Sequence, residues 1–251
     1  MEIAKTNIRN KFRKSTKSYN EHAEVQKIII DKLCNLMSNY IPNKFSEILE
    51  VGCGTGILTD KLSLNMNYDN YTVNDLVEDL CEETALRNGL NSLSGDVEKI
   101  KFDKKYDLIV SSSVFQWFYD LETMFNKFSS ILNEEAYLVF STFGPENFKE
   151  IKSITGEGLN YYEFNAIRTM LKSHFEIIYS GKEIEKLNFN YPSDVLKHLK
   201  NTGVNASSSN KVWTRSDLRR FNEGYLHFKS EMDSYPLTYE PYYFICKIIR
   251  K

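Results

Sequence analysis

The sequence predicts an α/β fold: a mostly parallel sheet of about seven strands with helices on both faces. Three observations predict it. From residue 44 onwards, short β-rich runs alternate with segments whose apolar residues repeat at helical spacing. The first of these runs, Ile48 to Val51, is short and apolar apart from Glu50 and ends in glycines, which is typical of a buried strand of a parallel sheet. That run leads directly into a glycine-rich turn and a helix, the transition at which open α/β sheets bind ligands.

Length and composition set bounds on the rest. At 251 residues the chain can bury a proper core, and we expect a single domain over 1–251. The net charge of −2 gives no global signal for nucleic acid or a membrane, and no apolar run approaches the roughly 20 residues of a membrane span. Four cysteines are scattered without a zinc or disulfide pattern, so no metal is expected. Because free thiols suit a reducing compartment and the N-terminus lacks a secretory signal, we expect a cytoplasmic protein.

The chain begins with a polar, cationic arm over residues 1–20, in which Phe12 and Tyr19 are isolated apolar points. They either staple the arm to the domain or close a lid over an active site, and the pattern favours neither. We expect an N-terminal helical lid over 1–40 and a cofactor-binding half over 44–142. The predicted elements are a helix over 23–37, a strand over 47–51, a helix over 57–64, a strand over 71–74, a short strand before Ser94, a strand over 107–110, a helix over 121–132 and a strand over 136–141.

The remaining residues, 143–251, form the expected substrate half. Residues 143–157 contain glycine and proline and are expected to be irregular. A helical cap is expected at about 192–230, as an insertion between late strands. The predicted elements are a helix over 162–173, a strand over 175–179, a capped helix opened by Pro192 and Ser193 that runs to about Lys200, a helix from a Thr214–Asp217 capping box through Phe228, and a final strand over 239–249.

The glycine-rich turn is the strongest single signal, and it reads Glu50-x-Gly52-x-Gly54-x-Gly56. Glycine permits φ > 0 in a tight turn and lets a ligand lie against bare backbone amides; simple turn geometry is the alternative. A dinucleotide fingerprint needs glycine at position 57, where Ile57 stands, so a nicotinamide dehydrogenase is disfavoured. The spacing resembles the first motif of class I S-adenosylmethionine-dependent methyltransferases, which implies a Rossmann-like sheet.

Acidic residues close the strands that follow. Asp75 lies 19 residues beyond Gly56, where a carboxylate can accept hydrogen bonds from a ribose diol; the alternative is that it caps the next helix. Asp96 follows Gly95, a pair that is also common in plain turns, and in this setting it can take the adenine amino group. The candidate cofactor-binding residues are Glu50, Gly52, Cys53, Gly54, Gly56, Asp75, Leu76, Asp96, Val97 and Ser112.

Five stretches spread over nearly the whole chain carry a more specific resemblance. They are Phe12-Arg13 with Tyr19, His22-Ala23 and Gln26; Glu50 to Gly56; Asp96; Gln116-Trp117; and Leu199-Lys200-x-x-Gly203 with Thr214-Arg215-x-x-Leu218 and Tyr235 to Tyr239. They resemble the biotin-pathway methyltransferases that esterify malonyl-acyl carrier protein or malonyl-CoA. The chain departs from that family at residues 14–16 and at Ser112.

The resemblance implies that a carboxylate oxygen attacks the sulfonium methyl of S-adenosylmethionine. A carboxylate is already ionised at neutral pH, so no general base is needed. Tyr19 and Trp117 are suited to close the pocket, and Lys200 or Arg13 to hold the carboxylate. A solvated surface position is the alternative for both cations. The candidate catalytic residues are Tyr19, Trp117 and Lys200.

A basic stretch predicts a protein partner. From Lys197 to Arg220 there are six cations and one anion, and carrier proteins of this kind are acidic, so complementary charge would steer docking here. An ordinary charged helix face is the alternative. Two other functions stay open: methylation of another small carboxylic acid or metabolite on the same scaffold, and cofactor binding without catalysis.

Overall fold

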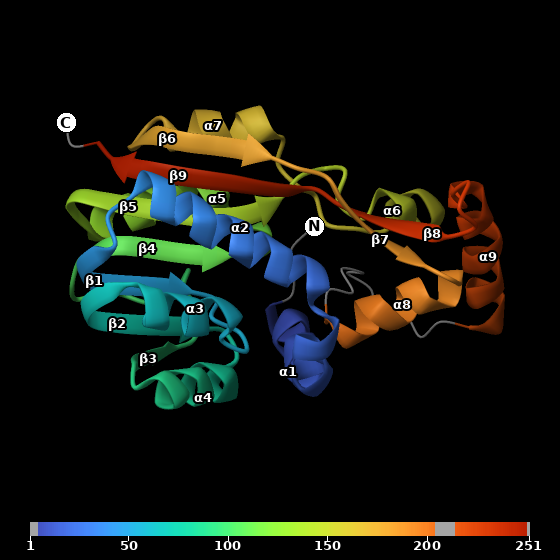
Figure 1. Ribbon diagram of the computed structural model, residues 1–251, viewed down its shortest axis with the longest axis horizontal. Coiled ribbons are helices and arrows are strands. Elements are labelled where there is room, and N and C mark those ends of the chain that lie inside the picture. The colour runs from blue at the N-terminus through green and yellow to red at the C-terminus, as the bar shows by residue number, and fades with distance from the viewer. Residues whose placement is uncertain (1–4, 204–213, 250–251) are drawn as a thin grey trace. The chain divides into compact units, whose positions relative to one another are not determined.

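The computed structural model describes residues 5–203 and 214–249 (Figure 1). The chain divides into two compact units. The large-sheet unit comprises Gln26–Thr142, Glu163–Lys182 and Tyr242–Lys251, and the small-sheet unit comprises Met1–Val25, Phe143–Tyr162 and Glu183–Pro241. Each unit is discontinuous in sequence. The expectation of one domain over 1–251, with a cofactor half and a substrate half, stays a prediction.

The large-sheet unit is built on a seven-stranded sheet with the order β3-β2-β1-β4-β5-β9-β6. The pairs β1–β2, β1–β4, β2–β3 and β4–β5 are parallel, and β9 pairs antiparallel with β6. The predicted mostly parallel, Rossmann-like sheet is therefore confirmed. Its strands are β1 Lys44–Val51, β2 Asn67–Asp75, β3 Asn91–Ser94, β4 Tyr106–Ser112, β5 Leu132–Phe143, β6 Phe175–Lys182 and β9 Pro241–Ile248.

Buried strands and amphipathic helices hold this unit together. One face of the sheet shares a core with α5 and α7, in which Phe140 of β5 stacks on Phe115 at 4.3 Å and on Phe244 at 4.9 Å between ring centroids. Figure 1 shows α2 crossing in front of the sheet. The helices are α2 Glu24–Tyr40, α3 Ile57–Asn65, α4 Glu78–Asn88, α5 Leu121–Ile131 and α7 Phe164–Leu171, with a 3₁₀ turn η1 Phe115–Trp117.

The small-sheet unit is mainly helical. Its two-stranded sheet pairs β7 with β8 antiparallel, so that Glu185 faces Tyr239 and Phe189 faces Tyr235. Helix α1 packs against α8, α6 against α9, and both α6 and α8 against β8. The elements are α1 Lys5–His22, α6 Lys149–Thr155, β7 Glu185–Phe189, α8 Pro192–Asn201, α9 Arg215–Tyr225, the 3₁₀ turn η2 Leu226–Phe228 and β8 Tyr235–Tyr239.

Three local predictions were wrong, and all fall in or beside the small-sheet unit. The stretch expected to be irregular contains α6. The final strand expected over 239–249 is two strands, because the chain changes sheets at Glu240, whose backbone carbonyl accepts from Gly144 N–H and whose carboxylate accepts from Glu146 N–H. Helix α8 begins with Pro192, and its N-cap residue is Tyr191, whose side chain makes no capping hydrogen bond. Ser193 therefore lies inside the helix and does not cap it.

The capping box at α9 is confirmed. Thr214 is the N-cap, its hydroxyl accepts from Asp217 N–H at 3.2 Å, and Asp217 accepts in return from Thr214 N–H at 3.0 Å. Two orphan N–H groups at the helix start are satisfied in this way. This cap depends only on residues three apart in sequence, which is why the pattern alone could locate it.

Candidate functional site

The carboxyl ends of parallel strands meet at one edge of the seven-stranded sheet. Register aligns Val51 of β1 with Asn74 of β2, and Asp75 of β2 with Ser94 of β3, while β4 pairs with the other side of β1. The loops that leave these strands carry the predicted cofactor residues. Open α/β sheets bind ligands at such an edge, so the large-sheet unit brings these candidates together.

The glycine turn has the backbone that the sequence predicted. Gly52, Gly54 and Gly56 all have positive φ, at 74°, 53° and 87°. A Cβ on Gly52 would lie 2.3 Å from the Val114 side chain, and one on Gly56 would meet the side chains of α4. A Cβ on Gly54 would meet nothing within 4 Å. Gly52 and Gly56 therefore permit close packing, whereas the Cα of Gly54 faces open space on the side where a side chain would stand, as a ligand cradle requires.

Residues outside the motif fix the turn in place. Asn74 O accepts from both Gly52 N–H and Cys53 N–H, at 2.8 and 2.9 Å. From α4, the Thr84 hydroxyl donates to Gly54 O at 3.1 Å, and the Arg87 guanidinium donates to Thr55 O at 2.9 Å. Sequence reasoning missed Thr84 and Arg87, because nothing in the pattern of α4 shows which side chains face the turn.

Asp75 is tied to the same turn. One carboxylate oxygen accepts from Gly54 N–H and the other from Val77 N–H, both at 2.8 Å. Val77 is the N-cap of α4, so the alternative that Asp75 caps this helix is wrong. Burial raises the pKa of Asp75, and hydrogen bonds from backbone N–H groups oppose that shift. A carboxylate has about four acceptor positions, so Asp75 retains capacity for a ribose diol beside Leu76, and that role stays a prediction.

Glu50 lies in the interior at the end of β1 and is 1% exposed. The Tyr71 hydroxyl donates to it at 2.5 Å. Burial raises the pKa of Glu50 to about 7, against an opposing contribution from the Tyr71 hydrogen bond. Its cofactor role stays a prediction, and its observed contact supports the strand beneath the glycine turn.

The loop that follows β3 is held from α5. The Lys127 ammonium donates to three backbone carbonyls, those of Val97, Glu98 and Ile100, at 2.8, 3.0 and 2.6 Å. Asp96 is half-buried and accepts from Glu98 N–H at 3.1 Å. The predicted adenine contacts of Asp96 and Val97 thus lie on an ordered loop, and Lys127 is a supporting residue that the sequence did not reveal.

The end of β4 carries the last cofactor candidate. The Ser112 hydroxyl lies 3.0 Å from that of Ser141, and the next residue, Ser113, has φ of 60°, a conformation that non-glycine residues adopt at a cost. The Gln116 amide donates to Ser113 O at 2.6 Å and accepts from Thr142 at 3.2 Å. These contacts shape the turn into η1, where Trp117 is half-buried.

The other two catalytic candidates belong to the small-sheet unit. Tyr19 is half-buried on α1 and lies within electrostatic range of Tyr239 of β8. His198 of α8 forms a 2.7 Å hydrogen bond with the Tyr239 hydroxyl, and burial lowers the pKa of His198 to about 4. Lys200 is exposed at the end of α8. Among the described residues, Lys200 makes no ion pair.

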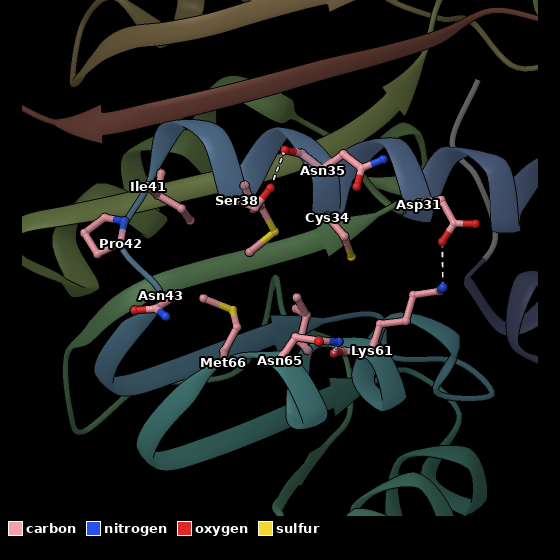
Figure 2. A pocket seen from close by; sticks show the side chains of 12 residues that line it. Asp31, Cys34, Asn35, Ser38, Ile41, Pro42, Asn43, Lys61, Asn65 and Met66 are labelled. Carbon is pink, nitrogen blue, oxygen red and sulfur yellow. Dashed lines mark hydrogen bonds and ion pairs between the residues drawn. The ribbon is translucent and has the colours of Figure 1, made fainter.

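Three further features of the described residues bear on the kind of site. No group of His, Cys, Asp and Glu among residues 5–203 and 214–249 is arranged to hold a metal ion. A pocket of 330 Å³ lies between α2 and α3 and contains the Asp31–Lys61 ion pair at 2.6 Å (Figure 2). It contains none of the candidate residues. None of the described helices combines the length and apolarity that crossing a membrane needs.

Known proteins with the same features identify the class. Residues 19–201 match the family described as "Methyltransferase domain". The YcgJ protein of Bacillus subtilis matches the fold with a TM-score of 0.61 at 12% identity, over 87% of this chain and 98% of that one. An N-methyltransferase from Bradyrhizobium japonicum, solved with S-adenosyl-L-homocysteine, matches with a TM-score of 0.52 at 14% identity, over 88% of this chain and 86% of that one. The fold and the glycine-turn edge are therefore those of a methyltransferase domain.

Sequence relatives narrow the class to a family. A malonyl-[acyl-carrier protein] O-methyltransferase from Calditerrivibrio nitroreducens is 41% identical, over 94% of each chain. Another protein of that name, from Bacteroides thetaiotaomicron, is 38% identical over 97% of this chain and 98% of its own. The chain belongs to the malonyl-[acyl-carrier protein] O-methyltransferase family.

Proposed function

We propose that this protein transfers a methyl group from S-adenosylmethionine to the free carboxylate of a malonyl group that is thioester-linked to acyl carrier protein. The methyl ester would enter the synthesis of biotin. The observation that carries the proposal is the identity of 38–41% to proteins named for this activity, over nearly the full length of each chain. The open glycine turn at the sheet edge supports it independently.

The residues of the large-sheet unit fit the cofactor. A Cβ on Gly54 would meet nothing within 4 Å, so this side of the turn is open, and Asp75 has acceptor capacity beyond its hydrogen bonds from backbone N–H groups. In this proposal the glycine turn lies against the cofactor, Asp75 and Leu76 hold the ribose, Asp96 and Val97 hold the adenine, and Ser112 lines the far side. Once bound, S-adenosylmethionine supplies an electrophilic methyl group on a sulfonium.

The protein's own task is alignment. A malonyl carboxylate oxygen forms the new C–O bond while the C–S bond breaks, and no proton has to move because the nucleophile is already an anion. Holding the two reactants in line can lower the barrier by roughly 7–11 kcal/mol. We assign Tyr19 and Trp117 to closing the pocket and Lys200 to orienting the carboxylate. His198 is not needed as a base, and its lowered pKa keeps it neutral.

Acidic neighbours offset part of the positive charge in the predicted docking stretch from Lys197 to Arg220. Arg219 pairs with Glu223 at 2.8 Å and Arg220 with Asp217 at 2.6 Å, so acidic neighbours on α9 offset both guanidinium charges. Lys197 and Lys200 are exposed on α8. Lys211 lies outside the described residues. Docking along this stretch remains part of the proposal.

One experiment tests the function directly. The protein is incubated with methyl-labelled S-adenosylmethionine and with malonyl-, succinyl- or acetyl-acyl carrier protein. Label should enter malonyl-carrier protein as a base-labile ester and should not enter acetyl-carrier protein, which has no free carboxylate. Comparable methylation of small acids without a thioester would shift the assignment to another metabolite. Tight cofactor binding without turnover on any acceptor would indicate a binding module.

A further inference from the structure

Helix α1 is the most cationic element of the described structure. Its sequence holds six cations and one anion, Glu21, a balance of +5 in 18 residues. Since the whole chain has a net charge of −2, everything outside α1 sums to −7. The cations are Lys5, Arg9, Lys11, Arg13, Lys14 and Lys17.

The apolar side of α1 is already occupied. Ile8 is buried, and Gly203, just beyond α8, comes so close that a Cβ there would lie 2.5 Å from the Ser15 hydroxyl and 3.4 Å from the Phe12 ring. The Ser18 hydroxyl donates to Asn201 O at 3.0 Å. The helix is therefore packed on α8 through one side, within the small-sheet unit.

The cationic side of α1 faces solvent. Arg9, Arg13 and Lys14 are exposed. Arg9 and Lys14 pair with no carboxylate in the part of the chain that the structure describes. Helix α9 differs, because its three arginines share the helix with Asp217 and Glu223, which leaves a balance of +1. Arg9 and Lys14 thus give α1 exposed positive charge that no carboxylate among the described residues pairs with, and the exposed Lys197 and Lys200 of the adjoining α8 add to it.

We propose that the exposed cationic face of α1, centred on Arg9 and Lys14, is the principal docking surface for the acidic carrier protein that delivers the substrate. This inference rests on the proposed function. Charge complementarity selects the occupant: a surface of one sign steers a partner of the opposite sign and raises its association rate. An anionic membrane is a poorer fit, because a helix that binds a bilayer needs a free apolar face and that of α1 is packed on α8.

The test compares two substrates that share the malonyl thioester and differ in the carrier. The double variant Arg9→Glu/Lys14→Glu should lower kcat/KM for malonyl-carrier protein by about tenfold at low salt, with a smaller loss at high salt because screening weakens the steering. Its kcat/KM for malonyl-CoA should stay within about twofold of the wild type, since the small thioester does not need the docking face.

A matched control removes the same charge elsewhere. Lys101→Glu/Lys105→Glu makes an equal charge change on the exposed loop before β4 of the large-sheet unit and should leave both substrates unaffected. The variant Arg9→Lys/Lys14→Arg keeps the charge and should retain the wild-type rate with malonyl-carrier protein. Unchanged cofactor affinity and thermal midpoint would establish that each variant is folded.

Several outcomes would overturn the inference. Equal losses on both substrates would make Arg9 and Lys14 structural, and equal losses in the control pair would reduce the effect to net charge. Binding of vesicles with anionic lipid, or of single-stranded DNA, that depends on these residues while carrier kinetics stay normal would assign the face to another partner. If the wild type methylates neither substrate, the proposed function fails instead, which separates the two results.

Discussion

The two units hold their buried polar groups in different ways. At the edge of the large sheet, side chains bond to backbone groups of neighbouring strands and helices, as Asp75 bonds to the Gly54 N–H, 21 residues away. In the small-sheet unit, side chains bond to backbone groups much farther along the chain: Glu150 accepts from Thr238 N–H, 88 residues away, and the Ser18 hydroxyl donates to Asn201 O, 183 residues away. Contacts of the first kind can be predicted from the spacing of residues in the sequence, whereas contacts of the second kind can be seen only in the folded structure. Local spacing can therefore predict contacts around the glycine turn more readily than contacts within the small-sheet unit.

The largest expected effect is the loss of stability on substituting Gly52, and it should differ from the effect of substituting Gly54 in the same turn. Gly52→Ala places a Cβ 2.3 Å from Val114 at a φ of 74°, so it should destabilise the fold by roughly 2–5 kcal/mol through left-handed strain and overpacking. Gly54→Ala meets no atom within 4 Å, so it should lose only about 1–2 kcal/mol of stability while weakening S-adenosylmethionine binding at least tenfold, as roughly estimated for a blocked backbone contact. Urea denaturation and calorimetry measure the two quantities. Equal stability losses would remove the distinction between packing and ligand glycines.

Deleting the N-terminal arm should distinguish the roles of the two units. Deleting residues 1–20 removes most of α1, which belongs to the small-sheet unit, and leaves every predicted cofactor residue in place. If the arm closes the active site, turnover should fall by roughly 100-fold or more while cofactor affinity stays within about twofold. Near-normal methylation of malonyl-CoA by the truncated protein would show that the arm is only a staple.

The pH dependence of stability should have opposite signs in the two units. The Glu50 pKa is raised to about 7, so the native state binds the proton more tightly, and the stability this provides is lost as pH rises from 4.5 through 7. The His198 pKa is lowered to about 4, so its contribution is lost as pH falls from 6.5 towards 4. Each of these two contributions to the free energy of unfolding amounts to at most about 3 kcal/mol, because a shift of one pKa unit corresponds to about 1.36 kcal/mol.

Two substitutions by the uncharged residue glutamine test the expected pH dependence of stability. Glu50→Gln should gain stability relative to the wild type above pH 7, and His198→Gln should gain it below pH 5, because each removes one titrating group. Urea denaturation from pH 4 to pH 8 gives the free energies of unfolding. A Glu50→Gln profile parallel to that of the wild type would show that this carboxyl group titrates normally in the native state.

The smallest effect concerns the ribose. Asp75→Ala should weaken S-adenosylmethionine binding by roughly 1.5–3 kcal/mol, the usual loss for hydrogen bonds to a charged group. Because Asp75 also accepts from Gly54 N–H and Val77 N–H, Asp75→Asn is the matched comparison: it keeps one acceptor oxygen for the turn and removes the charge. Calorimetry on both variants separates the roles. Normal affinity in Asp75→Ala would remove the ribose assignment.

The sequence alone determined the features that depend on neighbours along the chain. The strand before the glycine turn, the position of Asp75 at a strand end and the Thr214–Asp217 capping box follow from periodicity and short spacings, because local backbone geometry decides them. The family-specific stretches also identified the family before any contact was visible.

Only the tertiary structure decided which side chains meet. It placed Lys127 on three carbonyls of the loop after β3, buried Glu50 against Tyr71, and moved Tyr239 out of the final strand into a separate two-stranded sheet. It also packed the apolar side of α1 on α8, which leaves the cationic side facing solvent. These contacts join different helices and strands, and their energies depend on burial and geometry that no local pattern contains.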